Sequence, residues 1–202
     1  MTLDQFRPLA DRALGPFVLV AKRLGMTPNA VSVAAFTLAG LAGGVFYVAG
    51  EQSVLYAVGA VLVFANGWLD LVDGALAREL EVASAGGDFL DHVLDRYADI
   101  FMLVGLAAGV GRYGLGLAAV TGVLMTSYLG TQAQAVDLDR VYGGLLGRAD
   151  RLALIGLVAA IAAVVSGSFQ SLTVIGWLLV VFAVVGHLTA LQRFYYSMCA
   201  LE

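Results

Sequence analysis

The sequence predicts an all-α, polytopic integral membrane protein with six transmembrane helices and an N-terminal interfacial amphipathic helix. Apolar residues make up 60% of the 202 residues and charged residues only 13%, whereas a soluble domain carries about 25% charged residues. The apolar residues form long runs that short polar segments separate. Because a spanning helix needs about 20 apolar residues, the chain has room for six spans and for no separate soluble domain.

The N-terminal segment, residues 1–24, differs from the rest of the chain because it mixes charged and apolar residues. Phe6, Leu9 and Phe17 fall near helical spacing, and charged residues occupy the positions between them. This pattern predicts a helix that lies in the membrane interface. Residues 25–200 are expected to form a single six-helix membrane domain.

The six spans are expected at residues 30–49, 54–69, 88–110, 115–135, 152–165 and 172–195. Thr27 and Pro28 predict a helix start, with Thr27 as N-cap and Pro28 at the first helical position. The second span continues without a breaker into the polar residues that follow it. Residues 79–87 are expected to form a loop that the Gly86-Gly87 pair closes.

The basic residues predict the orientation in the membrane. In a six-span alternation one side carries Arg7, Arg12, Lys22, Arg23, Arg78, Arg140, Arg148, Arg151 and Arg193, and the other side carries Arg112. Because cytoplasmic loops are rich in Lys and Arg, both termini are expected in the cytoplasm. The net charge of −4 argues against a nucleic-acid partner.

Four aspartates form the most informative pattern in the chain. Asp70 and Asp73 are three residues apart, and Asp91 and Asp95 are four apart, so each pair occupies one face of a helix. The short loop between the two helices predicts antiparallel neighbours whose acidic faces meet. An ionised Asp in the hydrocarbon region costs at least about 2.5 kcal/mol. Two divalent cations, Mg²⁺ or Mn²⁺, are the expected partners because hard cations prefer carboxylate oxygens.

Small residues and one arginine accompany the aspartates. Gly74 and Ala77 leave a bare strip on the helix surface, which allows a ligand to approach the backbone closely. Arg78 ends this strip with a guanidinium that suits a phosphate. The strip therefore predicts a seat for a nucleotide diphosphate, and Gly87 is expected to let the third span begin close to the second.

The complete pattern, D(x)2DG(x)2AR(x)8G(x)3D(x)3D, resembles the signature of the CDP-alcohol phosphotransferases at every defining position. The resemblance implies a homodimeric membrane enzyme that transfers the phosphoalcohol part of a CDP-linked lipid, such as CDP-diacylglycerol or CDP-archaeol, to an acceptor hydroxyl and releases CMP. It also implies that Asp70, Asp73 and Asp91 hold two metal ions and that Gly74, Ala77 and Arg78 contact CDP.

The chemistry of direct transfer is consistent with this resemblance. Two cations about 3.5 to 4 Å apart can neutralise a diphosphate during in-line attack. Asp95 completes the metal cluster or accepts the proton of the acceptor hydroxyl, and it is the predicted base. Asp91 and Asp95 are thus the predicted catalytic residues. The active site is expected on the cytoplasmic side of the cell membrane.

Two further segments bear on the acceptor. Relatives that use inositol phosphate carry motifs similar to SYxKxRA and ERxER, and here Gly130 and Gln132 replace the Lys and Arg of the first motif. Arg148 and Arg151 retain the arginines of the second motif, and two arginines at a helix start can hold a phosphate. The expected acceptor is therefore a polyol phosphate, either glycerol phosphate or inositol phosphate.

Other interpretations of the sequence remain open. An unphosphorylated acceptor such as serine or inositol would need no phosphate-binding arginines, and a cation-coupled transporter or a nucleotide-binding scaffold would also place carboxylates in the membrane. Asp88 suits a helix cap, Asp99 a hydrogen bond to a neighbouring helix, and His92 simple packing. Asn66 is equally suited to orienting Asp70 or to lining a polar pocket.

Overall fold

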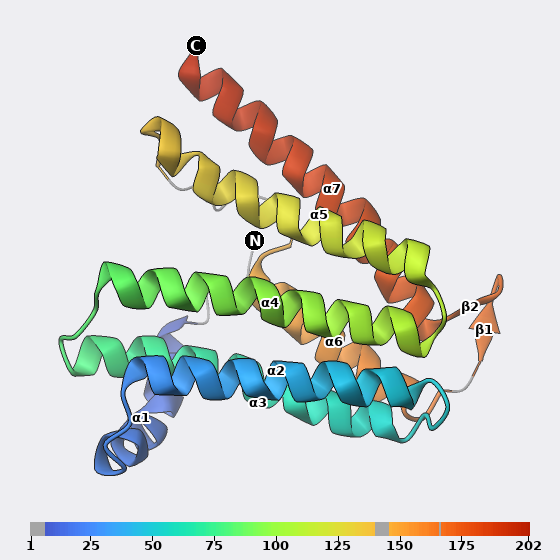
Figure 1. Ribbon diagram of the computed structural model, residues 1–202, viewed down its shortest axis with the longest axis horizontal. Coiled ribbons are helices and arrows are strands. Elements are labelled where there is room, and N and C mark those ends of the chain that lie inside the picture. Colours follow the sequence, from blue (N-terminus) through green and yellow to red (C-terminus); the bar gives the residue numbers. More distant parts are fainter. Residues whose placement is uncertain (1–6, 140–145, 166) are drawn as a thin grey trace.

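The computed structural model describes residues 7–139, 146–165 and 167–202 (Figure 1). Its helices are α1 (Arg7–Arg23), α2 (Pro28–Ala49), α3 (Leu55–Glu79), α4 (Ala85–Gly109), α5 (Tyr113–Gln132), α6 (Arg148–Ala162) and α7 (Val174–Leu201). A short 3-10 helix, η2 (Gln134–Val136), follows α5, and a hairpin of β1 (Ser168–Phe169) and β2 (Leu172–Thr173) precedes α7. The predicted all-α class is confirmed. Phe6 and Arg140, which entered the predictions above, lie outside the described residues.

Four of the described helices are long and apolar enough to cross a membrane: α2, α3, α5 together with η2, and α7. The two other predicted spans correspond to α4 and α6. Helix α4 carries Asp88, Asp91, Asp95, Arg96 and Asp99, and α6 has only 15 residues. The structure thus supports a membrane protein with four candidate spans, and it does not by itself establish the remaining two.

The helices form two groups that differ in direction (Figure 1). In the first group α2 packs against both α3 and α4, and α6 packs against α3. In the second group α5 packs along α7, and this pair extends away from the others at its C-terminal end. A common core of apolar side chains, which includes Phe46, Met102, Leu106, Ile155 and Phe182, connects the two groups.

Glycines allow α2 and α4 to approach each other closely. A Cβ atom on Gly43 would lie 2.5 Å from the carbonyl oxygen of Phe101, and a Cβ atom on Gly105 would overlap the backbone of Gly43. Small residues commonly let helices approach in this way within membranes. Helices α3 and α4 run antiparallel as predicted, and both pack along α2. Their acidic faces meet, as predicted.

The starts of α2 and α4 are each fixed by a side-chain cap. The hydroxyl of Thr27 accepts a hydrogen bond from the Ala30 amide at 3.2 Å, and Pro28 opens the helix, as predicted. Ser84 plays the same role for α4, because its Oγ accepts a hydrogen bond from the Gly87 amide at 3.1 Å. The prediction of a loop as far as residue 87 is therefore wrong, since Gly86 and Gly87 lie in the first turn of α4.

The connection between α6 and α7 also differs from the prediction. Residues 172 and 173 were expected at the start of the last span, but they pair with Phe169 and Ser168 as the second strand of the hairpin. Gln170 and Ser171 form the turn with positive φ values of 50° and 63°. Thr173 then caps α7 by accepting a hydrogen bond from the Gly176 amide at 3.2 Å, so the helix begins only at Val174.

Helix α1 lies across the end of α3 that follows the first two aspartates (Figure 1). Leu14 and Val18 are buried in a small cluster with Val72 and Leu76 of α3. Part of the apolar face of α1 therefore covers protein, while Phe17, Leu19 and Val20 are exposed.

Candidate active site

The four predicted aspartates meet at one place between α3 and α4. One carboxylate oxygen from each of Asp70, Asp73 and Asp91 lies within 4.8 Å of the others, which is close enough for a shared metal ion. A second group within the same limit consists of Asp91, Asp95 and His92. We refer to Asp70, Asp73, Asp91 and Asp95 as the acidic cluster. Because Asp91 belongs to both groups, it links the two halves of the cluster.

Helix α2 supports the acidic cluster through hydrogen bonds to α3. The Oγ atom of Ser32 donates a hydrogen bond to Oδ2 of Asp73 at 2.7 Å, and both side chains are buried. Asn66, one turn before Asp70, donates to the backbone carbonyl of Ala35 at 2.9 Å. Asn66 thus fastens α3 to α2 and does not orient Asp70. Since α2 lies against both α3 and α4, it sets the spacing between the two acidic faces.

Arg148, at the start of α6, reaches the acidic cluster from the opposite side. Its Nη1 atom is paired with Asp70, and its Nη2 atom lies 2.7 Å from Oδ1 of Asp95. The predicted phosphate ligand therefore contacts two predicted metal ligands. An arginine in this position partly compensates the like charges of the carboxylates.

A second layer of ion pairs lies beside the first. Nη2 of Arg151 binds Oδ2 of Asp99 at 2.9 Å, and both residues are buried. The Arg96 guanidinium lies 3.5 Å from Asp95 and 3.8 Å from Asp99. Asp99 thus makes the predicted bond to a neighbouring helix. Positive and negative groups alternate from Arg151 through Asp99, Arg96 and Asp95 to Arg148.

The donor set fits a hard divalent cation. All the close ligand atoms of the first group are carboxylate oxygens, and such oxygens suit Mg²⁺ and Mn²⁺. His92 adds a nitrogen to the second group, with its Nδ1 atom 3.8 Å from Oδ2 of Asp91. A histidine ligand is compatible with Mn²⁺ as well, so the packing role expected for His92 is not the only one that the geometry allows.

The strip of small residues follows the acidic cluster along α3. A Cβ atom on Gly74 would meet only Nη1 of Arg78, at 3.6 Å, so this surface is open apart from the arginine. Ala77 is half-buried and Arg78 is exposed. Gly87 faces a different neighbour from the predicted one, because a Cβ there would lie 3.3 Å from Oδ1 of Asn29 at the start of α2.

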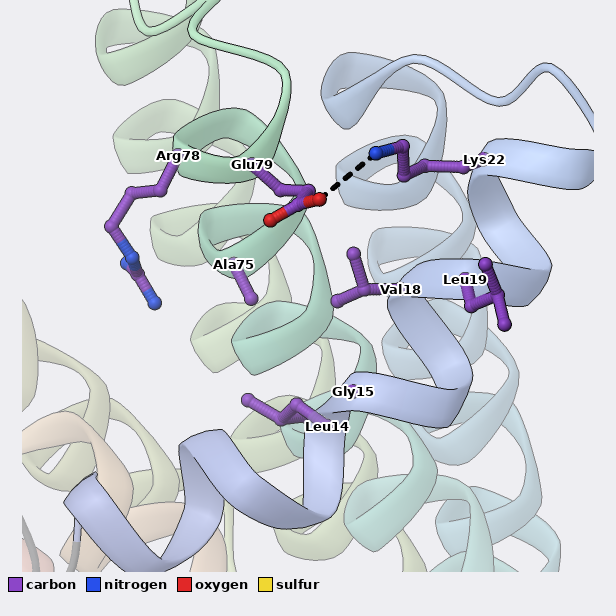
Figure 2. A pocket seen from close by; sticks show the side chains of 8 residues that line it. All are labelled: Leu14, Gly15, Val18, Leu19, Lys22, Ala75, Arg78 and Glu79. Carbon is purple, nitrogen blue, oxygen red and sulfur yellow. Dashed lines mark hydrogen bonds and ion pairs between the residues drawn. The ribbon is translucent and has the colours of Figure 1, made fainter.

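A groove of about 500 Å³ lies between α1 and α3 next to this strip (Figure 2). It is lined by Leu14, Gly15, Val18, Leu19, Lys22, Ala75, Arg78 and Glu79. Lys22 of α1 and Glu79 of α3 form an ion pair of 2.9 Å at its rim, and in this view Arg78 extends on the opposite side of α3. The groove therefore combines apolar walls with charged groups at one end.

Sequence reasoning missed the supporting roles of three residues. Ser32, which binds Asp73, lies 41 positions before it, and no local pattern links the two. Arg96 pairs with Asp95 and with Asp99, three positions further along α4, and this helical spacing is a signal that could have indicated the second pair. His92 lies off the helical line of Asp91 and Asp95, and this spacing favours packing over ligation. Its inclusion in a ligand group follows from the side-chain arrangement and not from helical spacing.

Together the fold and the site define a membrane enzyme with an acidic, metal-binding centre and adjoining cationic groups. The model of the CDP-alcohol phosphatidyltransferase family matches residues 25–188. The chain therefore belongs to the CDP-alcohol phosphatidyltransferase family. The family resemblance and the transferase class predicted from the motif are confirmed, and so is the predicted transfer reaction that uses a CDP-linked lipid.

Several curated proteins are similar over most of the chain. The archaetidylinositol phosphate synthase of Methanothermobacter thermautotrophicus is 32% identical over 200 residues, which cover 96% of this chain and 93% of that protein. The corresponding synthase of Pyrococcus horikoshii is 29% identical and covers 99% of this chain and 98% of that protein. A phosphatidylinositol phosphate synthase of Streptomyces avermitilis is 35% identical over 164 residues, which cover 76% of this chain and 64% of that protein.

Solved structures show the same fold. The phosphatidylinositol phosphate synthase PgsA1 of Mycobacterium tuberculosis with CDP-DAG bound has a TM-score of 0.78 at 23% identity and covers 92% of this chain and 94% of that chain. The same enzyme with manganese and citrate has a TM-score of 0.79, also at 23% identity, over 92% of this chain and 88% of that chain. The predicted dependence on a divalent cation agrees with the acidic groups found here and with manganese in that enzyme.

Proposed function

We propose that this enzyme transfers a phosphatidyl or archaetidyl group from a CDP-linked lipid to the hydroxyl of an inositol phosphate and releases CMP. The observation that carries the proposal is the position of Arg148, which places a phosphate-binding guanidinium 2.7 Å from the predicted base, Asp95. The names of the relatives similar over most of the chain favour inositol phosphate over glycerol phosphate as the acceptor.

The acidic cluster would hold two divalent cations, Mg²⁺ or Mn²⁺, through Asp70, Asp73, Asp91 and Asp95. When bound, the cations supply neutralising charge for the diphosphate of the donor and for the departing CMP. Ser32 keeps the Asp73 carboxylate in one orientation by its hydrogen bond of 2.7 Å. Metal sites commonly need such a hydrogen-bonding partner to fix the orientation of a ligating carboxylate.

The remaining groups bind the two substrates. The open surface over Gly74 and Ala77 would admit the CDP diphosphate, and Arg78 would pair with it. Asp95 accepts the proton of the acceptor hydroxyl as the oxygen attacks the lipid-linked phosphorus. Arg148 and Arg151 hold the phosphate of the acceptor, so that its hydroxyl lies close to Asp95.

The arrangement in the membrane is part of the same proposal. Residues 1–24 lie at the interface, and residues 25–200 form a domain in which α4 and α6 cross the membrane together with the four apolar helices. Both helices are partly enclosed by others, which accommodates their charged side chains. The active site then faces the cytoplasm, where CDP-lipid and acceptor are available, and two copies of the chain form a homodimer.

The test is a panel of labelled acceptors with the purified enzyme. Inositol 1-phosphate, glycerol 3-phosphate, serine and inositol are each incubated with CDP-diacylglycerol or CDP-archaeol in the presence of Mg²⁺ or Mn²⁺. We expect lipid product and CMP with inositol 1-phosphate. Product with serine or free inositol alone would overturn the acceptor proposal, and ion flux in proteoliposomes without CMP release would favour a transporter.

A variant experiment tests the assignment of the metal site. Asp91→Ala removes the residue common to both ligand groups, so we expect CMP release to fall by at least about a hundredfold. Binding of Mn²⁺, followed by electron paramagnetic resonance, should weaken in the same variant. Asp88→Ala removes an exposed carboxylate from the same helix and serves as the matched control. Retention of most activity by Asp91→Ala would overturn the site assignment.

A further inference from the structure

A buried ion pair joins Arg151 to Asp99, a carboxylate that the proposed reaction does not use. Oδ2 of Asp99 on α4 lies 2.9 Å from Nη2 of Arg151 on α6, and the two residues are only 2% and 4% exposed. Asp99 does not belong to either group that could hold a metal ion. It lies one turn further along α4 than Asp95, on the same face of the helix as the acidic cluster but outside the cluster.

The burial of this pair indicates a role beyond stability. Removing two charges from water is expensive, and a buried ion pair is seldom more stabilising than well-packed apolar residues of similar volume. Asp99 also faces Arg96 at 3.8 Å. A carboxylate that attracts two guanidinium groups fixes their positions, which matters most when one of those groups has a ligand to bind.

The guanidinium groups have unused donors. Among the described residues, the buried Nε atoms of Arg96, Arg148 and Arg151 have no hydrogen-bond partner. Buried donors are rarely left unsatisfied in proteins. The Nη2 atom of Arg151 is paired with Asp99, whereas its Nε atom is buried and unpaired. The guanidinium therefore keeps donor capacity that its ion pair with Asp99 does not use.

We infer that Asp99 is a positioning residue for the acceptor phosphate: it binds Nη2 of Arg151 and so fixes this guanidinium, which binds the anion together with Arg148 through its remaining donors. The inference rests on the proposed function, since it concerns the acceptor of that same site. It adds a residue that acts through Arg151 and touches neither metal nor substrate.

The first test is Asp99→Asn, which keeps the shape of the side chain and removes its charge. We expect the KM for inositol 1-phosphate to rise about tenfold. The KM for CDP-diacylglycerol and the Mn²⁺ concentration at half-maximal rate should change less than about twofold. Asp99→Glu, which restores the charge, should recover part of the loss. Asp88→Asn removes the same charge from an exposed position of α4 and should change none of these values.

The second test uses Arg151. Arg151→Lys keeps the positive charge beside Asp99 but lacks the planar guanidinium that can bind Asp99 and an anion at the same time, so the KM for inositol 1-phosphate should rise as in Asp99→Asn. If Asp99 acts only through Arg151, the double variant Asp99→Asn/Arg151→Gln should have the same acceptor KM as Arg151→Gln alone. The double variant has no unpaired charge at this position, and it therefore keeps the test usable if Asp99→Asn does not fold.

Two results would overturn the inference. One is an Asp99→Asn enzyme that folds and has an unchanged acceptor KM. The other is a loss that affects kcat and both substrates equally and adds to the effect of Arg151→Gln, since that pattern indicates a purely structural pair. Failure of the proposed function would look different, because the wild-type enzyme itself would then give no product with inositol 1-phosphate.

Discussion

Arg148 of α6 contacts Asp95 of α4 at a distance of 2.7 Å between Nη2 and Oδ1. The same guanidinium pairs with Asp70 of α3. One side chain therefore joins three helices at the acidic cluster and neutralises part of its charge. A cation held by Asp70 and Asp95 would compete with Arg148 for these oxygens, and the arginine would then be available to a phosphate.

The substitution Arg148→Gln tests separately whether this guanidinium neutralises the acidic cluster and whether it binds the acceptor phosphate. Without the guanidinium, Asp70 loses its ion pair and Asp95 loses the nearer of its two arginines, so the metal-free enzyme should be destabilised by about 3 kcal/mol. Added Mn²⁺ should raise the thermal unfolding temperature of the variant more than that of the wild type, because the competing charge is gone. The KM for inositol 1-phosphate should also rise by about tenfold or more.

Thermal unfolding in detergent, with and without Mn²⁺, measures the first effect. Lys22→Gln is a suitable control because it breaks an exposed ion pair with Glu79, and such pairs contribute about 0 to 1 kcal/mol. An equal response of Arg148→Gln and the wild type to Mn²⁺ would show that Arg148 and the cations do not compete.

The sequence predicted most of the helices because their signals are local. Thr27 and Pro28 mark the start of α2 by a cap and a fixed φ, and apolar runs of sufficient length follow. The arrangement of the helices could not be predicted in the same way. The close approach of α2 and α4 depends on Gly43 meeting Gly105, which are 62 positions apart.

The candidate site was predicted to the extent that its residues share a helix face. Helical spacing brings Asp91 and Asp95 together and predicts a common ligand role. The pairing of Asp95 with Arg148 was not predictable, since 53 positions separate them and the contact requires the packed position of α6. The sequence motifs marked each of these residues as a candidate site residue, but they did not show that the two residues touch.

Ser32→Ala tests whether α2 contributes to the metal site. The hydroxyl donates to Oδ2 of Asp73 at 2.7 Å, and its loss frees the carboxylate to rotate. Loss of such a partner typically weakens metal binding about 10- to 100-fold, so the Mn²⁺ concentration for half-maximal activity should rise within that range. Thr37→Ala removes an exposed hydroxyl from the same helix and should leave the Mn²⁺ requirement unchanged. A normal Mn²⁺ requirement in Ser32→Ala would exclude this role.

Gly74→Ala tests the proposed seat of the CDP diphosphate. The added methyl group would meet only the Arg78 guanidinium, at 3.6 Å, so the fold has room for it. We expect an unchanged or slightly higher unfolding temperature, because alanine favours helices over glycine by about 0.5 to 1 kcal/mol. The KM for CDP-diacylglycerol should nevertheless rise about tenfold. Gly114→Ala, at an open position of α5, is the control, and equal KM values in both variants would contradict the assignment.

Gly43→Ala tests whether the close contact of α2 and α4 supports the fold. A Cβ atom there would lie 2.5 Å from the Phe101 carbonyl, so the helices must separate. Such overpacking costs about 1 to 3 kcal/mol, which should lower the unfolding temperature measurably. The neighbouring substitution Gly44→Ala makes the same chemical change where no other atom lies within 4 Å, and it should be neutral or slightly stabilising. If both variants unfold at the same temperature, the spacing of the acidic faces must have another origin than this glycine contact.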